Sequence, residues 1–344
     1  MKKIYHWNKK SSPYNSLNIY AHFIGDMLNE IYGVESCYIY SDTDNFQQVI
    51  RELTQPDSNV VIFWHYGVFD YNIRYITDFS KVVFVYHNIT PAKYFWLTNP
   101  ISSLRAIGTY MQLYFLNENM KWITVSTFNK NCLARFHFKN IDECPVIPYR
   151  IKYGTINAVK QESCTLLYVG RITENKNCLK LIECIKEFAQ LYHSSINFVV
   201  VGKCSSKLYG TLFEKAWNKL FSIKHLKCKW YSDLDEKSLV SLYQSSWLYV
   251  TTSLHEGLGM PVCEAILNGT PAIYLECGGQ ESILNSIGMV ELKKENVFAT
   301  KILELIVNPE KKERLLQMQN KELRKKAYPN CKQLIKNIYG KYIE

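Results

Sequence analysis

The 344-residue chain has no run of about 20 uncharged apolar residues, the length that a membrane-spanning helix needs. Its first residues, MKKIYHWNKKSSPYN, also lack the apolar core of a secretory signal peptide. Eleven cysteines are present, but no two form a CxxC pair, and their scattered spacing fits neither a zinc site nor a disulfide framework. We therefore expect a cytoplasmic protein with free thiols.

Excess positive charge is confined to part of the chain. The formal net charge is +10, and residues 1–150 contribute only +2 of it. A basic half favours anionic partners, namely phosphate-bearing ligands, an acidic membrane surface or nucleic acid. Part of the excess lies in KKERLLQMQNKELRKKAY (311–328), which is typical of a solvated helix face, with membrane contact as the alternative.

Short, β-branched apolar runs alternate with helical stretches in both halves. Strands are expected within 60–66, 81–88, 121–128, 165–170, 196–202, 241–253 and 271–276. This alternation predicts an α/β protein with two Rossmann-like, doubly wound parallel-sheet domains that face a cleft, where ligands bind beyond the carboxyl ends of the strands. The expected boundaries are 1–150 for the first domain and 164–328 for the second, with 329–344 as a final helix.

The stretch HEGLGMPVCEA (255–265) places Glu256 and Glu264 on either side of two glycines and a proline. Proline suits the first turn of a helix, so a helix is expected to begin near Pro261. Glu264 is then placed to accept hydrogen bonds from ribose hydroxyls, and Glu256 from a second sugar. An ordinary glycine turn with an acid at a helix start is the alternative.

The loop inside this stretch is a candidate anion site. Glycine lets a ligand approach the backbone closely, and backbone amides at a helix start attract phosphate. The residues of this loop are Gly257, Leu258, Gly259 and Met260. The spacing therefore fits a ligand with a sugar at each end and phosphates between them.

A second segment, VGRITENKN (169–177), carries Arg171 and Lys176 on the loop after an expected strand. Two fixed cations can neutralise a departing diphosphate without a metal ion. Taken alone, such residues are more often surface charges. The acid pairs at 42–44 (DTD) and 233–235 (DLD) are interpreted as a turn and a helix cap, so no metal site is expected.

VGRITENKN and SLHEGLGMPVCEAILNGTPAIYLECGG together resemble the family 4 (group 1) retaining glycosyltransferases, which have the GT-B fold. The resemblance implies a metal-independent hexosyltransferase without a cofactor, whose final helix crosses back to the first domain. Arg171 and Lys176 would bind the donor diphosphate. Glu264 would hold the ribose, Glu256 would contact the donor sugar, and Gly202 would lie beside the nucleotide.

The segment YHNITPAKYF (86–95) looks like one found in bacterial members that build surface polysaccharides such as O-antigen, lipopolysaccharide or capsule. This implies a glycan acceptor linked to a lipid such as polyprenyl diphosphate, a place at the inner face of the membrane, and no nucleic-acid partner. The aromatic-rich stretch 94–122 could seat such an acceptor or touch an anionic membrane. Helix packing against the first sheet is the alternative.

Histidines and the acceptor side are less clearly marked. His65 matches a position where relatives have a histidine near the reacting sugar, and His87 could meet the acceptor. Both could instead be structural. The family's glycine-rich loop after the first strand is missing. Either Ser11, Ser12 or Asn15 serves in its place, or the acceptor side differs from that of the family. A non-catalytic nucleotide-sugar binder and a GT-B-fold epimerase are the alternative functions.

Overall fold

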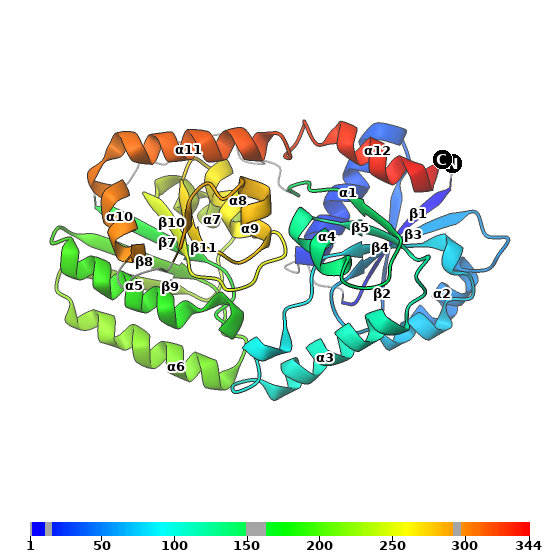
Figure 1. Cartoon of the computed structure of the whole chain (residues 1–344), viewed down its shortest axis with the longest axis horizontal. Coiled ribbons are helices and arrows are strands. Elements are labelled where there is room, and N and C mark those ends of the chain that lie inside the picture. The colour runs from blue at the N-terminus through cyan, green and yellow to red at the C-terminus, as the bar shows by residue number, and fades with distance from the viewer. Residues whose placement is uncertain (1, 11–15, 149–162, 292–296) are drawn as a thin grey trace. The chain divides into compact units, whose positions relative to one another are not determined.

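The computed structural model describes residues 2–10, 16–148, 163–291 and 297–344 (Figure 1). The chain forms two compact units, which are described separately here. Unit 1 consists of Met1–Ala92, Ile101–Arg150 and Arg324–Glu344. Unit 2 consists of Lys93–Pro100 and Ile151–Leu323. Unit 2 therefore includes a short segment from the first half of the sequence.

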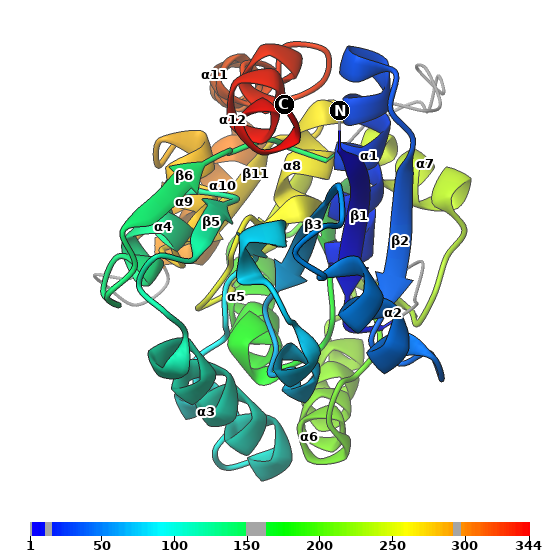
Figure 2. The ribbon, with the colours of Figure 1, turned by 90° about the vertical axis from the view of Figure 1, so that its right-hand side faces the viewer.

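Unit 1 is built on a parallel six-stranded sheet with the order β2-β1-β3-β4-β5-β6 (Figure 2). The strands are β1 (Lys3–Asn8), β2 (Ser36–Tyr40), β3 (Val60–Tyr66), β4 (Val82–Tyr86), β5 (Lys121–Thr124) and β6 (Asn140–Glu143). Every residue of β3 and β4 is buried, as the uniformly apolar sequence predicts for strands covered on both faces. The predicted strand 121–128 ends early because Ser126 caps the next helix and accepts a hydrogen bond from the Asn129 amide.

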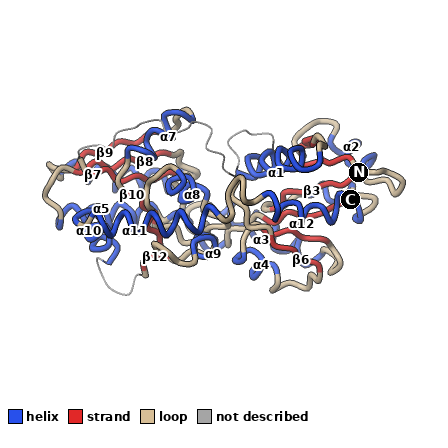
Figure 3. The backbone as a smooth tube through the Cα atoms, turned by 90° about the horizontal axis from the view of Figure 1, so that it is seen from above, coloured by secondary structure: helices blue, strands red, loops and turns tan. Residues whose placement is uncertain are grey.

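Helices cover both faces of this sheet. They are α1 (Ser16–Tyr32), α2 (Phe46–Leu53), α3 (Pro100–Phe115), α4 (Thr127–Leu133) and α12 (Lys332–Ile343). The helices α1 and α12 contact each other and share one apolar core with the strands (Figure 3). Side chains of α2, α3 and α4 form a second core on the other face. The final helix of the chain therefore belongs to the same unit as the first strand.

An aromatic ladder runs across four strands on the α2/α3 face. Trp7, Trp64, Phe84 and Trp122 stand opposite one another in register on β1, β3, β4 and β5. The rings of Trp7 and Trp64 are stacked with centroids 3.8 Å apart, and those of Phe84 and Trp122 are 4.5 Å apart. Cross-strand aromatic pairs of this kind fix strand register as well as burying large apolar surfaces.

Unit 2 has its own parallel six-stranded sheet, with the order β12-β11-β10-β7-β8-β9. Its strands are β7 (Cys164–Val169), β8 (Ile196–Val201), β9 (Leu226–Tyr231), β10 (Leu248–Thr251), β11 (Ala272–Leu275) and β12 (Met289–Val290). Its helices are α5 (Cys178–Leu191), α6 (Lys207–Asn218), α7 (Glu236–Ser245), α8 (Met260–Leu267), α9 (Gly279–Leu284), α10 (Val297–Val307) and α11 (Pro309–Arg324). The prediction of two doubly wound parallel sheets is confirmed.

Three further features agree with the bulk composition. All eleven cysteines are free thiols. Within the described parts of the chain, the helices are too short or too polar to cross a bilayer. In α11 only Gln319 and Leu323 are buried, so the lysine-rich segment has the predicted solvated face.

The contact between α12 and the rest of unit 1 yields a stability prediction. Ile335 is fully buried in the core shared with α1, whereas the next residue, Lys336, is exposed. We expect Ile335→Ala to lower the free energy of unfolding by about 2–5 kcal/mol, because it leaves a cavity in a packed core. Urea unfolding measures this, with Lys336→Ala as the control. Equal effects of the two substitutions would contradict the placement of α12.

Candidate functional site

Two loops at the carboxyl edge of the unit 2 sheet are joined by hydrogen bonds. The first follows β7 and contains the short 3₁₀ turn Glu174–Lys176, and the second follows β10. The Leu254 amide donates to the Asn175 carbonyl at 2.8 Å, and the Thr252 hydroxyl donates to the Asn177 carbonyl at 2.9 Å. The segments VGRITENKN and HEGLGMPVCEA therefore lie side by side, although about 80 residues separate them.

The central contact between these loops is an ion pair. The Lys176 ammonium donates a hydrogen bond to a carboxylate oxygen of Glu256. Only 14% of the Lys176 side chain and 12% of the Glu256 side chain are exposed. Removing two charges from water costs free energy that their attraction only partly returns, so such a pair is weak evidence for a purely stabilising role.

Glycines allow the second loop to pack closely on its neighbours. Gly259 has φ +79° and precedes α8 as its N-cap residue, a conformation that side chains disfavour. A Cβ on Gly279 would lie 2.3 Å from the Gly257 carbonyl oxygen. The Glu256 carbonyl accepts from the Gly279 amide at 2.9 Å. The Gly-Gly turn of ECGG thus packs directly against the backbone of the 256–259 loop.

Glu264 lies in the second turn of α8 and is held by a residue that the sequence did not single out. The hydroxyl of Tyr243, on α7, donates to its carboxylate at 2.8 Å. Burial raises the pKa of Glu264, and the Tyr243 hydrogen bond opposes that rise. Tyr243 therefore favours the ionised carboxylate, the form that accepts hydrogen bonds from hydroxyls.

Arg171 and Gly202 complete the predicted set. Arg171 is exposed, and its guanidinium makes no hydrogen bond or ion pair with the residues that the structure describes. Gly202 follows β8, where a Cβ would lie 1.9 Å from the Gly170 carbonyl oxygen. This glycine is therefore required for the two neighbouring loops to approach each other. The structure joins Lys176 to Glu256 directly and leaves Arg171 in solvent.

The segment Lys93–Pro100 adds side chains that sequence reasoning missed. The Tyr94 hydroxyl donates to the Leu254 carbonyl at 3.0 Å, and its ring lies 6.0 Å from that of His255. The Thr98 hydroxyl donates to the Glu174 carboxylate. Both contacts hold the loops that carry Lys176 and Glu256. In the sequence, this segment was marked only by the many aromatic residues of 94–122.

The acid pairs behave as interpreted. The segment 42–44 lies in turns between β2 and α2. Asp235 caps α7 and accepts from the Ser238 amide at 2.9 Å. Among the described residues, no group of three or more His, Cys, Asp or Glu is arranged to hold a metal ion.

Comparisons with known proteins agree with this geometry. Residues 152–322 match the family model of the glycosyl transferases group 1. These residues form a glycosyl transferases group 1 domain. The match covers the loops after β7 and β10 and all of the predicted donor-side residues.

Individual relatives are distant. An uncharacterized glycosyltransferase of Methanocaldococcus jannaschii, MJ1178, is 25% identical over 238 residues, which are 67% of this chain and 62% of that protein. The chain spans less than two thirds of the length of the curated relatives that it matches.

Solved structures of similar fold cover both units. A sucrose-phosphate synthase from Thermosynechococcus elongatus has a TM-score of 0.77 at 15% identity, over 99% of each chain. HepE of Anabaena, in complex with UDP-glucose, has a TM-score of 0.67 at 13% identity, over 99% of this chain and all of that one. The fold of the chain is therefore that of the GT-B glycosyltransferases.

The two histidines predicted from the family resemblance lie in unit 1 and are linked to a third. His6 Nδ1 and His65 Nε2 are 2.9 Å apart, as are His65 Nδ1 and His87 Nε2. His6 and His65 are fully buried, and Tyr20 of α1 packs edge-on against His87. Both ring nitrogens of His65 are thus engaged within the row.

Burial keeps all three imidazoles neutral. It lowers the pKa of His6 to about 3, with His22 adding to the effect, and lowers that of His87 to about 3. Burial is also the largest cause that lowers the pKa of His65, followed by its histidine neighbours. A neutral imidazole has one donor and one acceptor nitrogen, so the tautomer of one ring fixes that of the next. His65 can therefore set the tautomer of His87, at the carboxyl end of β4.

The predicted substitutes for the missing glycine-rich loop, Ser11, Ser12 and Asn15, lie outside the described residues. Their place on the acceptor side stays a prediction.

The buried histidines give the protein a pH-dependent stability. Their pKa lies below the value near 6.5 of an unfolded chain, so below that pH the unfolded state binds protons that the folded state does not. The stabilisation is complete above about pH 6.5 and falls as pH decreases, by about 2 kcal/mol for each fully buried histidine at pH 5. Urea unfolding at pH 7 and pH 5 measures the difference.

In His6→Phe, the loss of stability between pH 7 and pH 5 should be smaller by about that amount. His193→Asn, at an exposed position on unit 2, is the control and should keep the full loss. An unchanged loss in His6→Phe would show that His6 is not held neutral.

Proposed function

We propose that this protein is a retaining glycosyltransferase that moves a sugar from a nucleotide-sugar donor to a glycan acceptor. The contact between Lys176 and Glu256, beside the glycine-bounded start of α8, carries the proposal. It places a cation and a carboxylate beside the 257–260 backbone, at the edge of the sheet where ligands of such folds bind.

In this proposal the donor diphosphate replaces Glu256 as the partner of Lys176. The amides of the 257–260 loop and the Arg171 guanidinium then contact the same phosphates, and Gly202 leaves room for the nucleotide. Glu264, oriented by Tyr243, accepts the ribose hydroxyls. Once released from Lys176, Glu256 is able to accept hydrogen bonds from the donor sugar. The UDP-glucose bound to HepE, a protein of similar fold, supports a donor of this class.

The chemistry follows from the charges at this site. The bond between the anomeric carbon and the phosphate oxygen breaks, and the leaving diphosphate gains negative charge that Arg171 and Lys176 stabilise. The acceptor oxygen bonds to the same face of the sugar, and its proton passes to the leaving phosphate oxygen. We assign no metal ion to this step. His87 would meet the acceptor, with His65 fixing its tautomer.

We further propose that the acceptor is lipid-linked, as in bacterial surface-polysaccharide assembly, at the inner face of an anionic membrane. The outer face of α3 supports this. It exposes six large apolar side chains, Ile101, Leu104, Ile107, Met111, Tyr114 and Phe115. Arg105 is the only charged residue of the helix. A continuous apolar face of this kind is rare on a surface that meets only water.

The donor reaction is tested by substitution. A thermal-shift screen against UDP-, GDP-, ADP- and CMP-sugars first identifies the donor, because a ligand that binds the native state raises the unfolding temperature. We expect Lys176→Ala to lower kcat by about 10²–10³-fold, since it removes a cation that stabilises the leaving group. The control is Lys180→Ala, which removes a lysine paired with Glu183 on the surface of α5.

Turnover in excess EDTA should remain, and the anomeric configuration of the product, followed by NMR, should match that of the donor. Donor binding without turnover by the unmodified protein would instead indicate a non-catalytic binder, and release of a free altered sugar would indicate an epimerase. Unchanged donor affinity and turnover in Lys176→Ala would remove Lys176 from the mechanism.

The lipid-side proposal has its own test. We expect the protein to co-sediment with phosphatidylglycerol vesicles, and Leu104→Ser with Phe115→Ser to weaken this binding at least about tenfold, because two exposed apolar side chains are lost. Leu212→Ser, at an exposed position on α6, is the matched control. Binding that is equal in the two variants would rule out α3 as the contact.

A further inference from the structure

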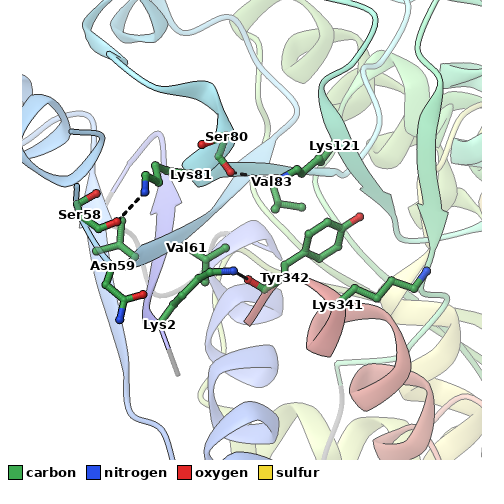
Figure 4. A pocket seen from close by; sticks show the side chains of 11 residues that line it. Lys2, Ser58, Asn59, Val61, Ser80, Lys81, Val83, Lys121, Lys341 and Tyr342 are labelled. Carbon is green, nitrogen blue, oxygen red and sulfur yellow. Dashed lines mark hydrogen bonds between the residues drawn. The ribbon is translucent and has the colours of Figure 1, made fainter. Parts of the chain in front are cut away.

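Three lysine side chains lie at the amino edge of the unit 1 sheet, the edge opposite to the strand ends that lead to His87. Lys2 directly precedes β1, Lys81 directly precedes β4, and Lys121 is the first residue of β5. They line one pocket of about 240 Å³ (Figure 4). The stem of Lys341, from α12, forms part of the same wall, while its ammonium pairs with Asp142 at 2.6 Å.

The lining carries no negative charge. Its remaining members are Ser58, Asn59, Val60, Val61, Ser80, Val83 and Tyr342. Two acids lie outside the lining: Asp142 accepts from Lys341 and Tyr342, and Asp78 accepts from Ser80 while its charge also attracts Lys81 and Lys121. Residues 1–150 have a net charge of only +2, so a pocket with this many cations and no acid is a local concentration of charge.

Each of the three ammonium groups retains hydrogen-bonding capacity. Lys2 donates to the Tyr342 carbonyl at 2.7 Å, Lys81 to the Ser58 carbonyl at 2.7 Å, and Lys121 to the Ser80 carbonyl at 3.1 Å. An ammonium group has three N–H donors, so these bonds leave two on each lysine. Capping of carbonyls explains one bond per lysine, but it does not explain why three lysines share one hollow without an acid.

The electrostatics of Lys121 point the same way. Burial lowers the pKa of Lys121, and the positive charge of Lys2 lowers it further. The negative charge of Asp78 offsets only part of this lowering. Lys2 and Lys121 therefore repel each other when the pocket is empty. A bound anion would remove this repulsion. The valine side chains of β3 and β4 would exclude water from part of the contact, which strengthens the electrostatic attraction.

We propose that this pocket is a second ligand site, separate from the donor site, and that it binds a phosphate or diphosphate group. Lys2, Lys81 and Lys121 supply charge-assisted hydrogen bonds to its oxygens, and Ser58 and Asn59 border it. The volume suits a group of this size rather than a whole nucleotide sugar. Soluble phosphate compounds and phospholipid headgroups carry the same chemistry.

Lysine NMR tests the site locally. The whole chain is labelled with ¹³C,¹⁵N-lysine, which leaves every ammonium group intact, and pyrophosphate is added at 0.15 M salt. We expect the Lys81 and Lys121 signals to shift with saturation, whereas the signal of Lys336, an exposed residue on α12, stays unchanged. Signals are assigned by their loss in single Lys→Gln variants. The Lys121 signal should also titrate at higher pH when pyrophosphate is bound, because an anion favours the ammonium form.

Affinity provides the second readout. The affinity for pyrophosphate is measured from the saturating shift of the Lys2 signal. The double substitution Lys81→Gln with Lys121→Gln should lower this affinity at least about tenfold, and Lys336→Gln should leave it within about twofold. A response to pyrophosphate but not to phosphatidylglycerol vesicles identifies a soluble ligand, and the reverse identifies a lipid headgroup. No response to either, or equal shifts of Lys121 and Lys336, overturns the proposal. The measurement does not depend on sugar transfer, so it stands or fails independently of the donor reaction.

Discussion

The contact between Lys176 and Glu256 is the interaction on which the proposed donor site of unit 2 depends. It holds together two loops that leave neighbouring strands, and it does so with charges that are almost entirely removed from water. A pair of this kind contributes little net stability, but it keeps each charge paired in the absence of a ligand. A diphosphate offers Lys176 more oxygens than one carboxylate does, so in the proposed reaction the exchange of partners couples donor binding to the release of Glu256.

The backbone around this pair is equally constrained. Gly279 supports the 256–259 loop, and Gly202 allows the loops after β7 and β8 to touch. Tyr94 and Thr98 brace the same loops from a segment far away in sequence. The charged groups are thus positioned by close backbone contacts rather than by long, flexible side chains, which favours a site whose geometry exists before the ligand binds.

Much of the fold could be predicted from the sequence, and the failures have a common cause. Strands buried on both faces, such as β3 and β4, are apolar throughout and were recognised. Apart from β1, which lies inside the unit 1 sheet, the strands that the pattern missed lie at the sheet edges. Three of them, β2, β6 and β9, are partly exposed and mix polar with apolar residues, and β12 has only two residues. An edge strand has only one neighbour and less cover, so its composition carries a weaker signal.

The site shows the same limit. Lys176, Glu256 and Glu264 lie in local motifs that can be recognised along the chain. The acid pairs that form a turn and a helix cap were recognised in the same way. Their partners could not be read in this way. Tyr243 meets Glu264 across two helices, and His6 meets His65 across two strands, so each pairing depends on the tertiary fold.

The segment Lys93–Pro100 makes the two units inseparable along the sequence. The chain passes between them four times, near residues 92, 100, 150 and 323, so no single cut yields two intact halves. A fragment that begins at 151 would keep the sheet and the glycine loops but lose Tyr94 and Thr98, which brace them. Replacement of unit 2 by that of a relative, in evolution or in the laboratory, would therefore require this eight-residue segment to be transferred together with residues 151–323.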